Sequence, residues 1–386
     1  MSRSDHGHLH FINPFKMIFS RESHQAPEEL SLLNEFERTL ATSLATLKPN
    51  DSLPLFSLSW MRHAVESLSE IHTKTKDLIT DLQFPVSVWE EKWIDIYLND
   101  SVKLLDICIA ITSELSRLDQ GQLSLQFVFQ ILEMSNNSLT SEQLKLVNAA
   151  LHDWLKLFNC KNLKLENCHD ILKNFSCSPF PEEAKCSAKG CILMRALYGV
   201  KVETLMVCSV IIVAVSGCSK YLLELHVPNK FLWSNVFNEL LAVLLPEIRA
   251  HLSSKNSTFL KEVEAVKMCV WSLHDLTGCA HDSEEIISNE VHVVYPEGDR
   301  LNRNELKEVD VISAEKLAGQ GKSEMLKELF SDLAIKTEKL SEELDLLSSQ
   351  VDRFFQIVLT GRQALLSNLR ASNMQTIERN REESIC

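Results

Sequence analysis

The most apolar stretch of the chain, residues 202–223, constrains its fold more than any other feature. It reads VETLMVCSVIIVAVSGCSKYLL, and the 16 residues between Glu203 and Lys220 carry no charge. A helix needs about 20 predominantly apolar residues to cross the roughly 30 Å hydrocarbon core of a bilayer, so this run is short for a span. A central helix surrounded by other helices has the same composition. A core helix and a membrane segment therefore both stay open.

Seven residues define the possible membrane segment, and they would contact lipid in a span or other helices in a core. These are Thr204, Val207, Val210, Ile211, Ile212, Val213 and Val215. Their β-branched side chains do not decide between the two interpretations, because both environments accept them.

Turn-forming residues are scarce, with 10 glycines and 10 prolines in 386 residues. Few turn-formers in a long chain indicate few, long elements and favour helices over many short strands. Apolar residues recur at spacings of three and four, as expected for helices with one buried face. Such segments begin near Leu30, Leu58, Trp89, Leu144 and Leu260. We predict an all-α fold, a bundle of long helices.

Pro49 and Pro85 end predicted helices, whereas Ser87–Glu90 and Thr140–Gln143 have the spacing of a capping box at a helix start. We expect a flexible N-terminal arm over 1–26, a helical bundle core over 27–276, a polar linker or insertion over 277–320, a long amphipathic helix over 321–371 that packs on the bundle, and a tail over 372–386.

The formal net charge of −14 argues against nucleic acid as a partner, because an acidic surface repels phosphates. The 11 cysteines are irregularly spaced, which is typical of buried free thiols and not of a small disulfide framework. The N-terminal segment lacks the features of a secretory signal, and it fits a chloroplast transit peptide poorly. We expect a membrane-associated or cytoplasmic protein, with a plastid location less favoured, and the oligomeric state stays open.

Candidate chemistry is weak throughout the chain. Among the cysteines between Cys160 and Cys191, only Cys186 and Cys191 are as close as C-x4-C, and the other gaps of seven or eight residues are wider than the usual thiolate pairs of zinc sites. Residues 319–323, GQGKS, resemble a fragment of a phosphate loop but lack its first glycine and its preceding strand. We predict no catalytic residue, no cofactor and no metal. Trp89 and Trp93 form a possible interaction surface, and their placement in the core is the alternative.

Several segments, in order along nearly the whole chain, resemble the plant BYPASS family. They are NPFKM (13–17), LSWMRHAVESLSEIH (58–72), LITDLQFPVSVWEEKWIDIYLNDSVKLLDICIA (78–110), SELSRLDQG (113–121), LMRALYGVKVET (193–204), LKEVEAV (260–266), TEKLSEELD (337–345) and VDRFFQIVLTGRQALLSNLR (351–370). These motifs are structural, and the family supplies no catalytic residues to carry over.

The resemblance implies a non-enzymatic regulator of plant root and shoot development that acts through protein contacts. Its founding member restrains a root-derived mobile signal that arrests shoot growth. Two alternatives remain: an adaptor in secretion that binds an exocyst subunit, and an unrecognised enzyme that acts on the precursor of the signal. The resemblance also raises the expectation of membrane association through the apolar stretch.

Overall fold

The computed structural model describes residues 27–82, 92–135, 140–157, 163–176, 188–253, 260–276 and 311–383. Regular elements within these ranges are all helical, which confirms the predicted all-α fold. The α-helices are α1 (Pro27–Thr46), α2 (Leu58–Asp81), α3 (Lys92–Met134), α4 (Ser141–Lys156), α5 (Leu163–Ser176), α6 (Ala188–Ser216), α7 (Ser234–Ser253), α8 (Lys261–Leu276) and α9 (Val311–Glu383). The predicted arm over 1–26, the predicted cap at Ser87–Glu90 and the predicted insertion up to residue 310 lie outside the described residues.

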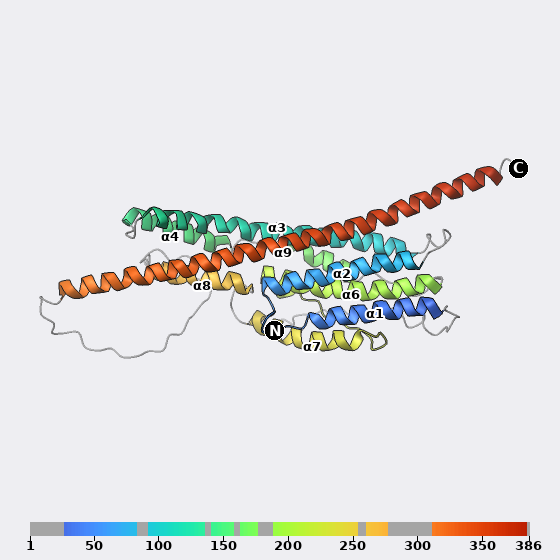
Figure 1. Cartoon of the computed structure of the whole chain (residues 1–386), viewed down its shortest axis with the longest axis horizontal. Coiled ribbons are helices and arrows are strands. Elements are labelled where there is room, and N and C mark those ends of the chain that lie inside the picture. The colour runs from blue at the N-terminus through green and yellow to red at the C-terminus, as the bar shows by residue number, and fades with distance from the viewer. Residues whose placement is uncertain are drawn as a thin grey trace, which may run out of the picture. The chain divides into compact units, whose positions relative to one another are not determined.

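The chain divides into two compact units. Unit 1 comprises residues 1–116, 162–252 and 345–386, and unit 2 comprises residues 117–161 and 253–344. Helices α3 and α9 contribute residues to both units. In unit 1, α1, α2 and α6 lie side by side and contact one another, as Figure 1 shows. In unit 2, α4 contacts α8.

Helix α6 forms the centre of unit 1. Every residue from Ile192 to Ala214 except Arg195 is buried, because α1, α2 and α5 all pack against this helix. Gly199 permits the close approach of α1, since a Cβ atom at this position would lie 2.5 Å from Leu40 Cδ2. The helix stops at Gly217, whose φ of 64° is the left-handed conformation that glycine adopts without a steric penalty.

Local capping signals agree with the structure where it describes them. The predicted capping box of α4 is confirmed: Gln143 N–H donates to Thr140 Oγ1 at 3.2 Å, and Thr140 N–H donates to Gln143 Oε1 at 2.9 Å. Helix α2 starts after Pro54, as predicted, and the Ser57 hydroxyl caps it by accepting from Trp60 N–H at 3.1 Å. Both caps satisfy donors that a helix start leaves without an internal partner.

Helix α9 is longer than the sequence predicts. It begins at Val311 instead of residue 321, and it continues to Glu383 instead of residue 371. Two glycines at 319 and 321 do not end it, because a glycine inside a helix costs only about 1 kcal/mol. The residues GQGKS therefore lie within a helix and not in a phosphate loop. Its buried stripe is Phe330, Leu333, Leu340, Leu344, Leu347, Val351, Phe354, Val358 and Leu365.

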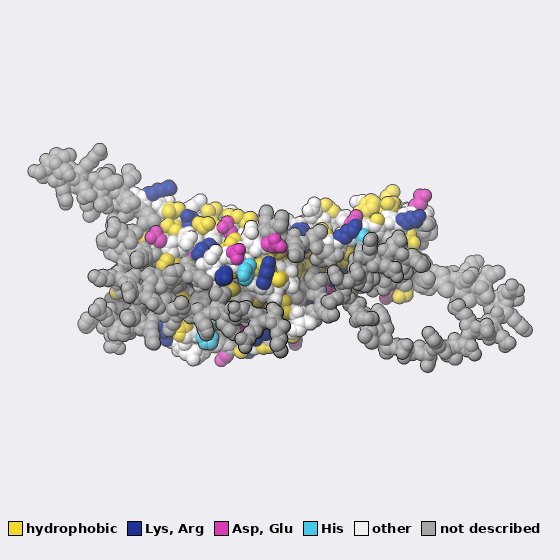
Figure 2. All heavy atoms as spheres, turned by 180° about the vertical axis from the view of Figure 1, so that it is seen from behind, with side chains coloured by type: hydrophobic (Ala, Val, Ile, Leu, Met, Phe, Trp, Pro, Cys, Tyr) yellow, Lys and Arg dark blue, Asp and Glu magenta, His cyan; other side chains and the backbone are white. Residues whose placement is uncertain are grey.

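Exposed side chains of mixed type cover the helices. On the face drawn in Figure 2, acidic and basic side chains of the described residues are interspersed among apolar ones. Unit 2 exposes several large apolar side chains on one helix: Leu123 is 61% exposed, Phe127 45% and Met134 79%, all on α3. Positions 123, 127 and 134 fall on one face of a helix with 3.6 residues per turn.

Candidate functional site on helix α6

Helix α6 carries four buried polar side chains in its otherwise apolar second half: Lys201, Glu203, Thr204 and Ser209. A polar group in a packed interior is costly unless it is hydrogen-bonded, so each of them requires a partner from a neighbouring element. Their partners come from α1, α2, α3 and the segment after α6. These contacts define a layer of buried polar residues in unit 1.

Lys201 forms a buried ion pair with Asp100 of α3. Its Nζ donates to Asp100 Oδ2 at 3.0 Å, and the lysine side chain is only 5% exposed. Lys103, one turn along α3, donates to the other oxygen, Asp100 Oδ1, at 3.1 Å. Both ammonium groups also lie over the Phe175 ring of α5, at 5.2 Å for Lys201 and 5.9 Å for Lys103. Both carboxylate oxygens of Asp100 therefore accept from a lysine.

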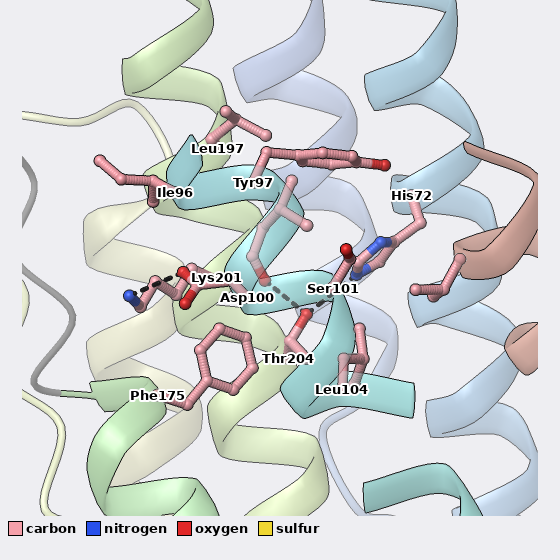
Figure 3. Close-up of a pocket in the computed structure, with 12 residues that line it drawn as sticks. His72, Ile96, Tyr97, Asp100, Ser101, Leu104, Phe175, Leu197, Lys201 and Thr204 are labelled. Carbon is pink, nitrogen blue, oxygen red and sulfur yellow. Dashed lines mark hydrogen bonds and ion pairs between the residues drawn. The ribbon is translucent and has the colours of Figure 1, made fainter. Parts of the chain in front are cut away.

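A small cavity separates this ion pair from a second polar pair, His72 and Thr204 (Figure 3). Its volume of about 40 Å³ is space for little more than ordered water. The Thr204 hydroxyl donates to Val200 O at 2.7 Å, so the 3.1 Å contact with His72 Nε2 requires the imidazole to donate. Burial lowers the pKa of His72 to about 4, which keeps the ring neutral.

Glu203 faces the opposite side of α6, toward α1 and α2. Its Oε1 accepts from Ser67 Oγ at 2.6 Å and from Ser43 Oγ at 3.2 Å, and the two serine hydroxyls also contact each other. Its Oε2 is buried and has no hydrogen-bond partner among the residues that the structure describes. Burial raises the pKa of Glu203 to about 7, although the hydrogen bonds from Ser67 and Ser43 oppose the shift.

Two further polar contacts fix the ends of this layer. The Arg195 guanidinium pairs with the buried Glu37 of α1, and Leu232 N–H donates to the same carboxylate at 2.9 Å. Near the other end of α6, the Ser209 hydroxyl donates to Tyr221 O at 2.7 Å and accepts from Leu223 N–H at 3.0 Å. These contacts fix the position of α6 relative to α1 at one end and relative to the segment that follows α6 at the other end.

The polar layer can exchange protons and hold a water molecule, but most of its polar groups are already hydrogen-bonded to one another. Lys201 and His72 both have protein partners, and the cavity between them is too small for an organic substrate. Among the described residues, no group of three or more His, Cys, Asp or Glu side chains is placed to hold a metal ion. Cys108 and Cys208 are buried free thiols whose pKa values are raised by burial, as their apolar surroundings predict.

The structure places the residues of the possible membrane segment inside unit 1. Thr204, Val207, Val210, Ile211, Ile212 and Val213 are buried, and Val215 is half-buried. Helix α6 has the length and composition of a membrane span, yet 89% of its most apolar window is buried among other helices. Trp89 lies outside the described residues, and Trp93 lies in α3, where its side chain is not described. The possible interaction surface at these two positions therefore stays a prediction.

Sequence reasoning missed the polar layer. Lys201 and Glu203 border the uncharged run, and the motif LMRALYGVKVET contains both, but no pattern in the sequence assigns them partners. Asp100, His72 and Ser67 lie about 100 to 136 residues away from those partners, so only the tertiary contacts bring them together. A charged residue flanking an apolar helical run was the one available signal.

Known proteins are similar to this chain over nearly its whole length, and a family model matches its N-terminal part. The family model described as Protein ROH1-like matches residues 13–163. The chain is 37% identical to UPF0496 protein 4 of Oryza sativa subsp. japonica over 94% of each chain. It is 38% identical to Protein BPS1, chloroplastic, of Arabidopsis thaliana, over 96% of this chain and 93% of that protein. No solved structure matches the chain.

The name of the Arabidopsis relative places that protein in the chloroplast, and the membrane-associated or cytoplasmic location expected for this chain stays a prediction. A third relative, UPF0496 protein 4 of Oryza sativa subsp. indica, is 36% identical over 94% of each chain, and all three matches, like the ordered motifs already described, span more than nine-tenths of the proteins compared. The chain belongs to the plant BYPASS family, that of BPS1 and the ROH1-like proteins.

Proposed function

We propose that this chain is a non-enzymatic regulator of plant root and shoot development that restrains a root-derived signal arresting shoot growth. The observation that carries the proposal is the 38% identity to Protein BPS1 over 96% of the chain. The Lys201–Asp100 and His72–Thr204 pairs support a non-enzymatic role, because they lie around a cavity of only about 40 Å³. Substrate pockets are usually far larger, at roughly 300 to 1,000 Å³.

Complementation tests this role. Plants that lack their own BYPASS protein should show arrested shoots, and expression of this chain in the root alone should restore shoot growth. A matched control is the chain carrying Ile212→Asp, which should not fold. Arrested shoots in plants that accumulate the wild-type chain to the normal level of the missing protein would refute the proposal.

An adaptor role in secretion, with an exocyst subunit as partner, is the second candidate. The exposed stripe of Leu123, Phe127 and Met134 on α3 favours it, because large apolar side chains on one helix face mark protein contact sites. An amphipathic helix of a partner fits such a stripe through its own apolar positions.

Charge substitutions on this stripe test the adaptor role. Leu123→Glu with Phe127→Glu should abolish co-purification of exocyst subunits from plant extract, while the thermal unfolding midpoint stays the same. Gln126→Glu on the same exposed face is the control for added charge alone. Equal recovery of exocyst subunits with the wild type and the double variant would exclude this stripe as their docking site.

We also propose that α6 is the core helix of a bundle that does not span the membrane. Support comes from the polar partners of α6: insertion of this helix into a bilayer would separate Lys201, Glu203 and Ser209 from the groups on other elements with which they pair. Ile212 is fully buried, so Ile212→Asp would bury an unpaired carboxylate and should cost about 5 kcal/mol or more.

Two measurements decide between core and span. Alkaline carbonate should release the wild-type chain from membranes, and Ile212→Asp should move the chain into the insoluble fraction. Resistance of the wild type to carbonate extraction, with its termini protected from protease on opposite sides, would make α6 a span. A fluorescent fusion locates the protein, and import into plastids would overturn the expected cytoplasmic or membrane-surface location.

A further inference from the structure

A polar groove lies between α1 and α2 on unit 1, on the side of α6 that carries Glu203. It encloses about 400 Å³, within the usual size range of small-ligand sites. Eight of its nine lining residues are of polar type, and none of the nine is lysine or arginine: Thr39, Thr42, Ser43 and Thr46 from α1, and His63, Glu66, Ser67, Glu70 and Ile71 from α2.

The hydroxyl groups of the groove present acceptors to a ligand, because their hydrogens are already used. Thr39 donates to Glu35 O at 3.0 Å, Thr42 donates to Arg38 O at 3.0 Å, and Thr46 donates to Ser43 O at 2.8 Å. The oxygens of Thr39 and Thr42 keep lone pairs after the hydrogen has been donated, and Thr46 keeps one, because it also accepts from His63 Nε2 at 3.1 Å. The α1 wall is therefore a row of neutral acceptors.

The floor of the groove adds a buried acid to these acceptors. Ser43 and Ser67 line the groove and direct their hydrogens to Glu203 Oε1, so they too offer lone pairs outward. Glu203 is fully buried behind them, and within the described part of the chain its Oε2 has no hydrogen-bond partner. On the α2 wall, Glu66 and Glu70 supply two exposed carboxylates.

We infer that this groove binds a linear aliphatic diamine or polyamine through Glu66, Glu70 and the hydroxyl oxygens above Glu203. A primary ammonium group is a donor without acceptors, which is the complement of an acceptor-rich wall. Glu66 and Glu70 lie one turn apart, about 6 Å along the helix axis, close to the separation of the two nitrogens of extended butane-1,4-diamine. The aliphatic segment between the ammonium groups matches Ile71, the one apolar lining residue.

A divalent cation is the competing ligand for an acidic groove. Calcium and magnesium require several oxygen ligands within about 2.6 Å of one ion, in a converging arrangement. Among the described residues, no three carboxylate, histidine or cysteine side chains converge in that way. Carboxylates spaced along a groove suit two separated ammonium groups better than a single small ion.

Calorimetric titration of the full chain with butane-1,4-diamine, at pH 7.5 and constant ionic strength, tests the inference. Glu66→Gln with Glu70→Gln should weaken binding at least tenfold, since each substitution removes a charge-assisted hydrogen bond. Glu203→Gln should weaken it less, because this carboxyl acts from behind the two serines. Asp77→Asn, an exposed carboxylate of α2 outside the groove, should leave the affinity within about twofold.

Two further ligands test whether binding depends on the charge of the diamine, on its length alone, or on a preference of the groove for a metal ion. Butane-1,4-diol has the same length without charge and should not bind, and Mg²⁺ at the same ionic strength should not displace the diamine. The inference is overturned if the Glu66 and Glu70 double variant or Glu203→Gln binds the diamine as the wild type does, if the diol binds equally, or if Mg²⁺ competes. Thermal unfolding of each variant without ligand verifies that the fold is intact.

Discussion

Lys201 and Glu203 lie two residues apart on the same buried helix, yet their surroundings differ. Lys201 has a carboxylate partner, Asp100, and sits beside a cavity of about 40 Å³. Glu203 has only hydroxyl partners, leaves one oxygen unpaired and sits behind a groove of about 400 Å³. A buried charge with a carboxylate partner fixes the register of helices, whereas a buried acid with an unpaired oxygen behind a large groove remains available to a ligand or a proton.

The largest effect on stability in this comparison is expected from breaking the ion pair between Lys201 and Asp100. Asp100→Asn leaves the Lys201 ammonium buried without its carboxylate and should lower the free energy of unfolding by roughly 3 kcal/mol. Adding Lys201→Met should restore part of this loss, because the unpaired charge is then gone. Asp77→Asn breaks the exposed pair with Lys74 and should change stability by about 1 kcal/mol or less. Urea unfolding at pH 7 measures all three, and equal losses for Asp100→Asn and Asp77→Asn would contradict the assignment.

Glu203 should make stability fall as the pH rises. Its pKa is about 7 in the folded chain and 4.5 in the unfolded one, so between these values the folded state holds a proton that the unfolded state has lost. The contribution is full below pH 4.5 and is lost by about pH 7, a change of about 3 kcal/mol. Glu203→Gln should remove this dependence in urea unfolding between pH 4.5 and 8. The same dependence of the free energy of unfolding on pH in the wild type and the variant would contradict the prediction.

His72 should act in the opposite direction with a smaller effect, because its side chain is only partly shielded from solvent. Its pKa is about 4 when folded and 6.5 when unfolded, so the unfolded state binds the extra proton between these values. Stability is then full above pH 6.5 and falls as the pH drops toward 4, by roughly 2 kcal/mol. His72→Gln should remove the fall in stability between pH 6.5 and 4. Urea unfolding of this substitution in a Glu203→Gln background measures the histidine effect without the contribution of the Glu203 carboxyl.

The smallest effect is expected at a neutral member of the layer. Ser209→Ala removes two hydrogen bonds, to Tyr221 O and Leu223 N, and should cost about 1 to 2 kcal/mol. Because no titrating group is lost, the cost should be the same at pH 5 and pH 8. A cost that varies with pH would mean that Ser209 is coupled to the charged members of the layer.

Much of the helical organisation was predictable from local patterns. The capping box at Thr140, the start of α2 after Pro54 and the buried stripe of α9 follow from nearest-neighbour chemistry and from the 3.6-residue period. The predicted start of α9 was wrong, because glycines at 319 and 321 weaken a helix without stopping it, and the predicted end at residue 371 was too early. The candidate site was not predictable, since Glu203 meets Ser67 across 136 residues of sequence.

The amino-acid sequence by itself determined the class of fold, because apolar periodicity and a shortage of turn-formers leave long helices as the way to bury 45% hydrophobic residues. It also determined the family, through motifs that run in order along the chain. Only the tertiary structure showed that the apolar stretch is buried among other helices of unit 1. Composition measures how strongly a helix avoids water, but the partners of Lys201, Glu203 and Ser209 come from elements distant in sequence, and those partners make α6 the centre of a protein core.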